Sequence, residues 1–353
     1  MTDPGSSGGA TSGSGPEHWL GRDDLPWNIL LVASLDRVPS TELLRRRLAE
    51  LSSSEGWPEP PEGAVVEGEV HSVVTRLGAL VDRVCPVSVG RTPSGLVVRA
   101  HHAYVDGLGL LAVLSALLDE EVASGATGIG DRGRRSTVAT MATRVLELAL
   151  RPPAPVASSP GGSQPPPGED VYAVAVVPRA VRTAELAHAA VQAIASRNVD
   201  AHRRADRIAL AVGVSTTGGA DLRVGDHSGF LRFTDAERFG VAELEQALAT
   251  GPLQVGGTAQ GGAARRTGRA IRWASRVFAG RLGSTVLVSH LGRVNAPGLS
   301  AAGFFPLAGN GSGVSVGAAT VATTTTLTLR ARGYQHAATG LESLLADVVR
   351  RLT

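Results

Sequence analysis

Residues 96–118 place a strand pattern, a tight turn and an apolar helix pattern directly after one another. Residues 96–102 alternate well enough for a strand, and leucines at helical spacing between 108 and 118 mark one face of a helix. Neighbouring strand residues point to opposite faces of a sheet, so His101 and His102 cannot both line one cleft. The stretch therefore requires a mixed fold in which a strand end meets a helix start, with one histidine facing the cleft.

The rest of the chain repeats this mixture of strands and helices, which predicts a mixed α/β fold. Ser40 is a good N-cap for a helix with leucines at 43, 44, 48 and 51. Thr323 to Thr326 predict a half-exposed strand, because β-branched residues favour strands. We expect strands at 28–35, 65–70, 171–177, 208–214, 230–233, 285–289, 314–321 and 323–329, and helices at 43–51, 73–84, 137–150, 183–197, 241–248, 265–282 and 341–352.

The length of 353 residues is enough for two domains of medium size. Seven prolines fall within residues 151–168, together with Gly and Ser, which is typical of a linker. Residues 1–16 are rich in Gly and Ser and predict a disordered tail. We therefore expect an N-terminal subdomain at 17–150, a linker at 151–168 and a C-terminal subdomain at 169–353.

Composition excludes several classes of protein. A net charge of +2 and 4% aromatic residues argue against a nucleic-acid partner. The chain has no lysine, which rules out a Schiff-base lysine and a P-loop lysine. Cys85 is the single cysteine, so no cysteine pair can bind zinc, and a cytoplasmic location is expected. The longest apolar run, 108–118, is about half the length that spans a bilayer.

The segment HHAYVDG at residues 101–107 holds the best candidates for catalysis. A histidine at a strand end suits proton abstraction near neutral pH, and we assign this role to His102. The amide of Gly107, at the start of the leucine-rich helix, could stabilise a developing oxyanion. Asp106 is expected to be structural and to pair with an arginine that fixes the turn. The candidate arginines are Arg99, Arg223 and Arg232.

The pattern HHxxxDG between a strand and an apolar helix resembles the signature of the condensation-domain superfamily of acyltransferases. This resemblance implies two chloramphenicol-acetyltransferase-like subdomains in a V-shaped arrangement, with a tunnel that reaches the second histidine. It implies that His102 is the base, that His101 and Asp106 are structural, and that Gly107 is a turn residue. Ser289 and His290, in the segment SHLG, resemble part of the second half of this family and are candidate tunnel contacts. The chain is shorter than typical members, notably after residue 51.

The resemblance implies transfer of an acyl group from a thioester to an amine or hydroxyl of a small-molecule acceptor. The expected setting is natural-product biosynthesis, such as that of nonribosomal peptides, with no permanently bound cofactor. The donor would be attached to the phosphopantetheine arm of an acyl or peptidyl carrier protein, or to coenzyme A. Arg134 and Arg204 are candidate contacts for an acidic carrier. Two alternatives stay open: a cyclase or dehydratase acting on a tethered intermediate, and a non-catalytic module that binds a carrier.

Three competing patterns carry less weight. Residues 107–112 match the dinucleotide pattern GxGxxA, but the motif intervenes between strand and glycine, and regular βαβ units are absent. Residues 5–9 match the hydrolase pattern GxSxG, although they lie in the Gly/Ser-rich tail with no strand before them. His227 lies beside Asp226 and Ser228, and it is better explained as a loop histidine.

Overall fold

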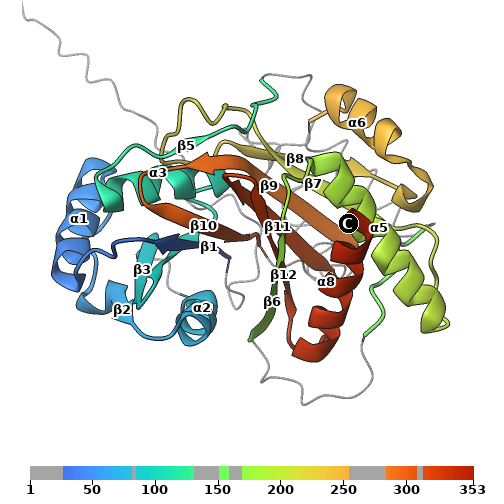
Figure 1. Ribbon diagram of the computed structural model, residues 1–353, viewed down its shortest axis with the longest axis horizontal. Helices are drawn as coiled ribbons and strands as arrows, with labels where there is room; N and C mark the ends of the chain where they lie inside the picture. Colours follow the sequence, from blue (N-terminus) through green and yellow to red (C-terminus); the bar gives the residue numbers. More distant parts are fainter. Residues whose placement is uncertain (1–26, 82–84, 131–150, 159–168, 254–283, 308–312) are drawn as a thin grey trace, which may run out of the picture.

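The computed structural model describes residues 27–81, 85–130, 151–158, 169–253, 284–307 and 313–353. The helices predicted at 137–150 and 265–282 and the tail at 1–16 lie outside the described residues, as do most of the predicted linker and Arg134. Below, residues 27–130 are called the N-terminal half and residues 151–353 the C-terminal half. Figure 1 shows a β-sheet in each half, with the two sheets side by side.

The N-terminal sheet has five strands in the order β10-β1-β4-β3-β2 within the described residues. The strands are β1 (Asn28–Leu35), β2 (Val65–Glu67), β3 (Val87–Thr92), β4 (Gly95–His101) and β10 (Leu299–Phe305). Alternation along β1 places Ile29 and Leu31 in one apolar cluster and Leu30 in another. Both faces of this sheet are therefore buried.

Three helices accompany this sheet: α1 (Thr41–Ser54), α2 (Val70–Gly78) and α3 (Gly107–Leu118). Ser40 caps α1 by accepting a hydrogen bond from the amide of Leu43, as the sequence predicts. The cluster on one face contains residues of α1 and α3, and the cluster on the other face contains residues of α2. Because α3 begins at Gly107, its N-terminus lies at the end of the histidine motif.

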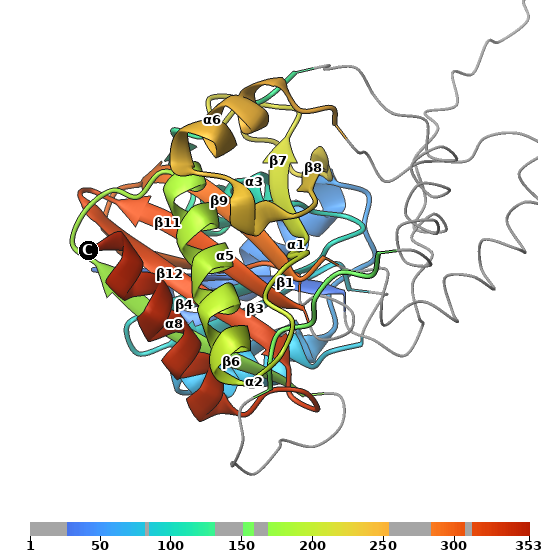
Figure 2. The same cartoon turned by 90° about the vertical axis from the view of Figure 1, so that its right-hand side faces the viewer.

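The C-terminal sheet follows the order β6-β12-β11-β9-β7-β8. Its strands are β6 (Asp170–Val177), β7 (Leu210–Ser215), β8 (Ser228–Phe233), β9 (Val286–Asn295), β11 (Val314–Val321) and β12 (Thr324–Arg332). The α-helices among the described residues of this half are α5 (Thr183–Asp200), α6 (Val241–Thr250) and α8 (Ala338–Leu352). Figure 2 shows α5 and α8 side by side across the strands.

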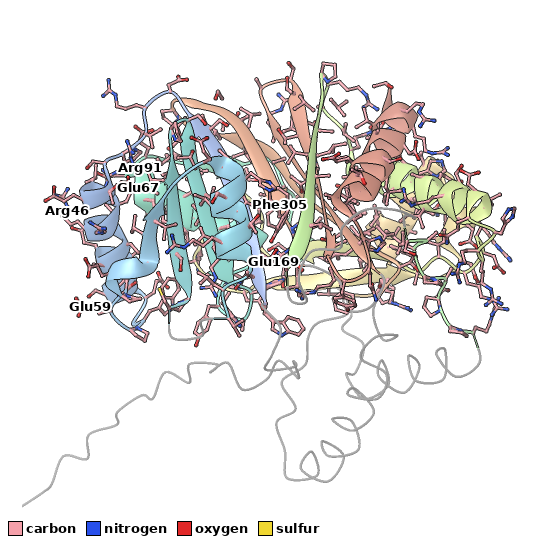
Figure 3. All side chains as sticks on the ribbon, turned by 90° about the horizontal axis from the view of Figure 1, so that it is seen from below. Arg46, Glu59, Glu67, Arg91, Glu169 and Phe305 are labelled. Atoms are coloured by element: carbon pink, nitrogen blue, oxygen red, sulfur yellow. The ribbon has the colours of Figure 1, made fainter. Side chains whose placement is uncertain are left out.

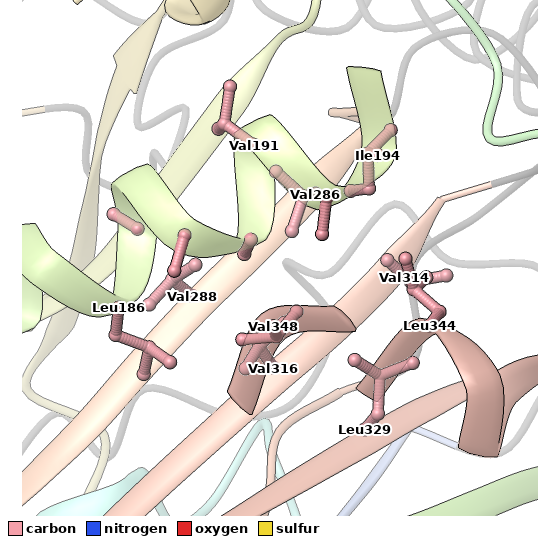
Figure 4. Packing of buried hydrophobic residues seen from close by; sticks show 14 of the residues in the cluster. Leu186, Val191, Ile194, Val286, Val288, Val314, Val316, Leu329, Leu344 and Val348 are labelled. Carbon is pink, nitrogen blue, oxygen red and sulfur yellow. The ribbon is translucent and has the colours of Figure 1, made fainter. Parts of the chain in front are cut away.

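Buried apolar side chains pack between α5, α8 and the sheet in the region shown in Figure 4. We call this region the helix-covered core. Val286 and Val288 of β9 and Val314 and Val316 of β11 point toward it. The helices contribute Leu186, Val191, Ile194, Leu344 and Val348. The burial of these side chains is the main stabilising contribution in this half.

The two halves exchange strands. Strand β10 belongs to the C-terminal half in sequence, but it pairs antiparallel with β1 of the N-terminal sheet. In the other direction β5 (Ala123–Ser124), which follows α3, pairs with the end of β9. Each sheet is therefore completed by a segment of the other half, and β10 passes close to the start of α3.

The fold class predicted from the sequence is confirmed, and most predicted elements have counterparts in the structure. The half-exposed strand predicted at Thr323 to Thr326 is wrong in one respect, because Thr325 and Thr326 are buried. The hydroxyls of Thr320 and Thr325 satisfy each other at 2.9 Å, which allows a polar strand into the interior. Within the described ranges, no helix combines the length and the apolar character needed to cross a membrane.

Candidate active site

His102 follows the last residue of β4, at the point where the chain leaves the N-terminal sheet. Its backbone N–H donates to the carbonyl of Trp27 at 2.8 Å, and the next residue of that segment, Asn28, pairs with His101 in the ladder. The backbone of His102 is thus fixed by the start of β1. Its side chain is partly exposed, as a proton-transfer group requires.

His101 is buried, in contrast to His102. The amide of Ala103 donates to His101 Nδ1 at 3.3 Å, and the ring of Tyr104 lies edge-on with its centre 5.9 Å away. The backbone N–H of His101 donates to Pro86 O at 2.8 Å. These local contacts fit the structural role expected for His101.

Asp106 is the N-cap of α3, and its carboxylate joins two parts of the chain. Oδ1 accepts a hydrogen bond from the amide of Gly109 at 2.7 Å, and Oδ2 accepts one from the amide of His227 at 3.0 Å. The amide of Asp106 donates in turn to Gly225 O at 2.9 Å. The side chain therefore ties the histidine motif to the loop between β7 and β8.

Burial raises the pKa of Asp106 above its ordinary value. The amide of Gly109 opposes this effect, the nearby carboxylate of Asp226 adds to it, and the charge of His102 lowers the pKa.

No ion pair between Asp106 and an arginine is present among the described residues, so the expected partner stays a prediction. Arg223 pairs with Asp221 at 2.9 Å, and Arg99 donates to the side chain of Asn28. The N-cap geometry directs the carboxylate of Asp106 toward backbone amides of the first helical turn. Two N–H groups stabilise the carboxylate.

Two glycines allow the motif to pack closely against the C-terminal half. A Cβ atom on Gly107 would lie 2.9 Å from a methyl group of Leu291 in β9 and 3.1 Å from the ring of Phe304 in β10. A Cβ atom on Gly109 would lie 2.7 Å from the backbone oxygen of Gly225. The start of α3 therefore contacts three segments of the C-terminal half, and a side chain larger than hydrogen would separate them.

Ser289 and His290 lie in β9, just before Leu291. The register of β9 against β11 shifts between His290 and Arg293, so simple strand alternation does not give the direction of the His290 ring. Its Nδ1 accepts from the amide of Gly292 at 3.1 Å, and burial lowers the pKa of His290 to about 4. Ser289 faces Gly213 of the neighbouring strand β7. The structure thus brings this strand to the motif through Leu291.

Arg204, a candidate carrier contact, lies beyond α5 on the surface and is 3.4 Å from the carboxylate of Asp206. An open hollow of about 760 Å³ lies at the far end of α3. Its wall includes the carboxylates of Glu55, Asp119, Glu120 and Glu121. In the described ranges, no group of three or more His, Cys, Asp or Glu residues could hold a metal ion.

Sequence reasoning missed the loop at 225–228 as a part of the site. Gly225 and His227 contact Asp106 through their backbones, and Asp226 accepts from both the amide and the hydroxyl of Ser228. The segment GDHSG has the composition of a turn, which is the only local signal it carries. Nothing local in the sequence connects it with a motif more than a hundred residues away.

No family model and no curated protein matches the chain. Solved structures do match it. A variant of the starter condensation domain of rhizomide synthetase, in complex with C8-CoA and Leu-SNAC, is 15% identical, with 93% of this chain and 89% of that chain covered and a TM-score of 0.54. The wax ester synthase/diacylglycerol acyltransferase of Marinobacter aquaeolei VT8 is 12% identical, with 95% of both chains covered and a TM-score of 0.52.

These likenesses extend over nearly the whole chain, and they establish its fold. The chain shares its fold with the rhizomide synthetase condensation domain and the wax ester synthase, as the resemblance at 101–107 predicts. At these levels of identity the comparison concerns architecture, and the chemistry has to be argued from the residues of this chain.

Proposed function

We propose that the protein is an acyltransferase that moves an acyl group from a thioester to an amine or hydroxyl acceptor, with His102 as general base. The observation that carries this proposal is the placement of His102. It lies at the end of β4 with its side chain partly exposed, next to the N-terminus of α3 and at the meeting point of both halves. A base and a helix N-terminus side by side are what acyl transfer requires.

In the proposed reaction His102 removes the proton from the acceptor N–H or O–H as the heteroatom attacks the thioester carbonyl carbon. The carbonyl π bond breaks, and its electrons form an oxyanion. When the C–S bond then breaks, the sulfur leaves as a thiolate and receives the proton that His102 holds. The base is regenerated, and no redox partner or metal ion takes part.

The start of α3 supplies candidate donors for the oxyanion. Amides of the first helical turn have no partner inside a helix, and Asp106 already binds the amide of Gly109. We assign the amide of Gly107 as the donor, aided by the positive end of the helix dipole. The approach of substrates through a tunnel between the halves, as the resemblance implies, belongs to the same proposal.

The donor is proposed to be a thioester of a carrier protein or of coenzyme A. The rhizomide synthetase domain was crystallised with C8-CoA and Leu-SNAC, which are both thioesters. Carrier docking on an acidic surface would be unfavourable, so the hollow with Glu55 and Glu120 is not the docking site. Arg204 and Arg134 remain the candidates for this contact. Natural-product biosynthesis is the proposed setting.

The test is mass spectrometry of reactions that contain the protein, one acyl thioester and one acceptor. Acyl-coenzyme A and acyl-carrier donors of matched chain length are each offered with a primary amine and a primary alcohol. The expected result is a new amide or ester and free thiol in equal amounts. The matched control is His102→Gln, which keeps a polar side chain of similar size but has no basic nitrogen.

The other functions predict different products. A cyclase or dehydratase would convert a tethered donor without an acceptor, with loss of the thiol or of water. A non-catalytic module would bind an acyl carrier and leave every thioester intact. If neither transfer nor hydrolysis above the His102→Gln background occurs with any pair, the acyltransferase proposal is wrong.

A further inference from the structure

Arg330 of β12 is a fully buried charge at the junction of the two sheets. Its Nε donates to Asp170 Oδ2 at 2.8 Å, and its Nη2 lies 2.6 Å from the same oxygen. Arg332 donates to the other oxygen of Asp170 at 2.9 Å. Burying such ions costs free energy, and apolar side chains of similar volume are often at least as stabilising. Stability alone therefore does not account for Arg330.

The guanidinium of Arg330 also reaches the N-terminal half. Its Nη1 donates to the carbonyl oxygen of Asn28 at 2.5 Å and to that of Pro306 at 3.2 Å. Asn28 is the first residue of β1, and the carbonyl directly before it, that of Trp27, accepts the hydrogen bond from the His102 amide. Two consecutive peptide carbonyls thus link a buried arginine of one half to the proposed base in the other.

The side chain of Asn28 extends this linkage. Its Nδ2 lies within hydrogen-bond distance of three carbonyl oxygens at the end of α2, those of Leu77, Gly78 and Leu80, at 3.3, 3.1 and 2.6 Å. Its Oδ1 accepts from Nε of the buried Arg99 at 2.9 Å. Asn28 therefore fixes the end of α2 and strand β4 relative to β1.

Arg99 continues the linkage to the segment that precedes β3. Its Nη1 donates to Cys85 O at 2.7 Å, and the next carbonyl, that of Pro86, accepts from the amide of His101. The backbones of both motif histidines are consequently held by segments that these buried polar groups fix. We call Asn28, Arg99, Asp170 and Arg330 the polar junction.

Aromatic rings close the polar junction. The guanidinium carbon of Arg330 lies over the ring of Tyr172, 5.5 Å from its centre. The ring of Tyr172 in turn meets that of Phe305 edge-on, with the ring centres 5.3 Å apart. Figure 3 shows Phe305, and Glu169 at the start of the β6 segment, where the two halves meet. Low dielectric around the junction strengthens its hydrogen bonds, so its geometry is well defined.

We propose that Arg330 is a positioning residue for His102, which acts through Asn28 and Trp27 and not by contact with substrate. The proposal rests on the proposed function in one respect, namely that His102 is the catalytic base. In physical terms, β12 of the C-terminal sheet fixes the end of β4 through the hydrogen bonds of Arg330 with Asn28 and of Trp27 with His102. A displacement of about 1 Å at a reacting group can reduce a rate by about a hundredfold, so such a link matters for turnover.

The matched pair Arg330→Lys and Arg332→Lys tests this role. Both arginines bind Asp170, and both variants keep the positive charge. A lysine at 330 can neutralise Asp170, but it lacks the second guanidinium nitrogen that donates to the carbonyl of Asn28. We expect kcat of Arg330→Lys to fall by about tenfold or more. KM should stay within about twofold, and Arg332→Lys should behave like the wild type. Thermal melting of each variant sets a common assay temperature below both transitions.

Hydrogen exchange measured by mass spectrometry gives a readout that needs no activity. Peptides that cover residues 98–106 contain the His102 amide, and peptides from 338–352 report on the helix-covered core. In Arg330→Lys we expect exchange in the first set to accelerate by about tenfold while the second set is unchanged. Asn28→Asp, of equal size, removes the Nδ2 donor and should accelerate the same peptides, should Arg330→Lys fail to fold.

The outcomes separate the two proposals. If kcat falls equally in both lysine variants, in proportion to their lower melting temperatures, Arg330 is merely structural and the inference is overturned. Unchanged exchange at 98–106 in both Arg330→Lys and Asn28→Asp would do the same. A wild-type protein without transfer activity would remove the proposed function, and the exchange comparison would still decide whether Arg330 fixes the backbone of His102.

Discussion

The helix-covered core and the polar junction stabilise the protein by different kinds of interaction. The first is built from aliphatic side chains of α5, α8 and the C-terminal sheet, and the second from buried arginine, asparagine and aspartate at the seam of the two halves. Apolar contacts are non-directional, so they stabilise without fixing one geometry. Hydrogen bonds fix distance and angle, which suggests a division between stability and the position of the site.

The largest expected effect separates stability from activity. His102→Ala should reduce kcat by about a hundredfold or more, through loss of the general base, while the melting temperature changes little. Leu344→Ala in the helix-covered core should instead cost about 2–5 kcal/mol of unfolding free energy. The activity of that folded variant should remain near the wild type. Turnover of His102→Ala within a few-fold of wild type would remove His102 from the mechanism.

Asp106→Ala should affect stability and activity together, because it removes a helix cap and the tie to the 225–228 loop. We expect a loss of about 2–3 kcal/mol, measured by urea unfolding, since one buried and one partly buried amide lose their acceptor. Ser40→Ala removes a local cap from α1 and should cost about 1 kcal/mol without altering kcat. Equal effects of the two variants on kcat would show that the tie across the halves has no role in catalysis.

Acidification should destabilise the protein through His290. The ring has a pKa of about 4 in the folded state, below its ordinary value of 6.5, so its contribution is complete above pH 6.5 and is lost as the pH falls toward 4. At pH 4.5 the loss should be about 2.5 kcal/mol of unfolding free energy. The raised pKa of Asp106 acts in the opposite direction, because the folded state then takes up its proton first.

His290→Gln separates these contributions to the pH dependence. The variant should lose stability less steeply than the wild type between pH 6.5 and 4.5, as followed by urea unfolding at each pH. Parallel curves for the two proteins would mean that His290 is not the group responsible. Activity of the variant at neutral pH tests separately whether His290 is a tunnel contact.

The smallest effect concerns the contact between α3 and the loop. Gly109→Ala should cost about 1–2 kcal/mol, because its Cβ would press on the backbone oxygen of Gly225, and kcat should fall as the loop moves. Gly63→Ala is the control, since a Cβ there meets nothing within 4 Å. Thermal melting and kcat of both variants check the expectation, and equal melting temperatures would contradict it.

Local periodicity in the sequence predicts the strands and helices of the helix-covered core. It is much less informative about the contacts between the two halves, including the polar junction. Strand β1 and helix α8 follow from regular apolar spacing, as does the cap at Ser40. Strand β10 was not predicted, because its residues 300–303 are small and its partner β1 is more than 250 residues away. Arg330 lies in an alternating stretch, LTLRAR, in which an arginine ordinarily faces solvent. Its burial depends on Asp170 and Asn28, and one sequence gives no sign of those contacts.

The pairing of β10 with β1 has a consequence for the synthesis of the chain. Strand β1 is synthesised before β10, and this strand, which covers the outer edge of β1, follows only after some 260 further residues. At about 5–20 residues per second this interval is on the order of tens of seconds. During that time an apolar strand edge has no native partner, and such edges readily pair with other chains. Heterologous expression at reduced temperature, or with a chaperone that shields strand edges, should therefore raise the yield of native protein more than any change within the finished fold.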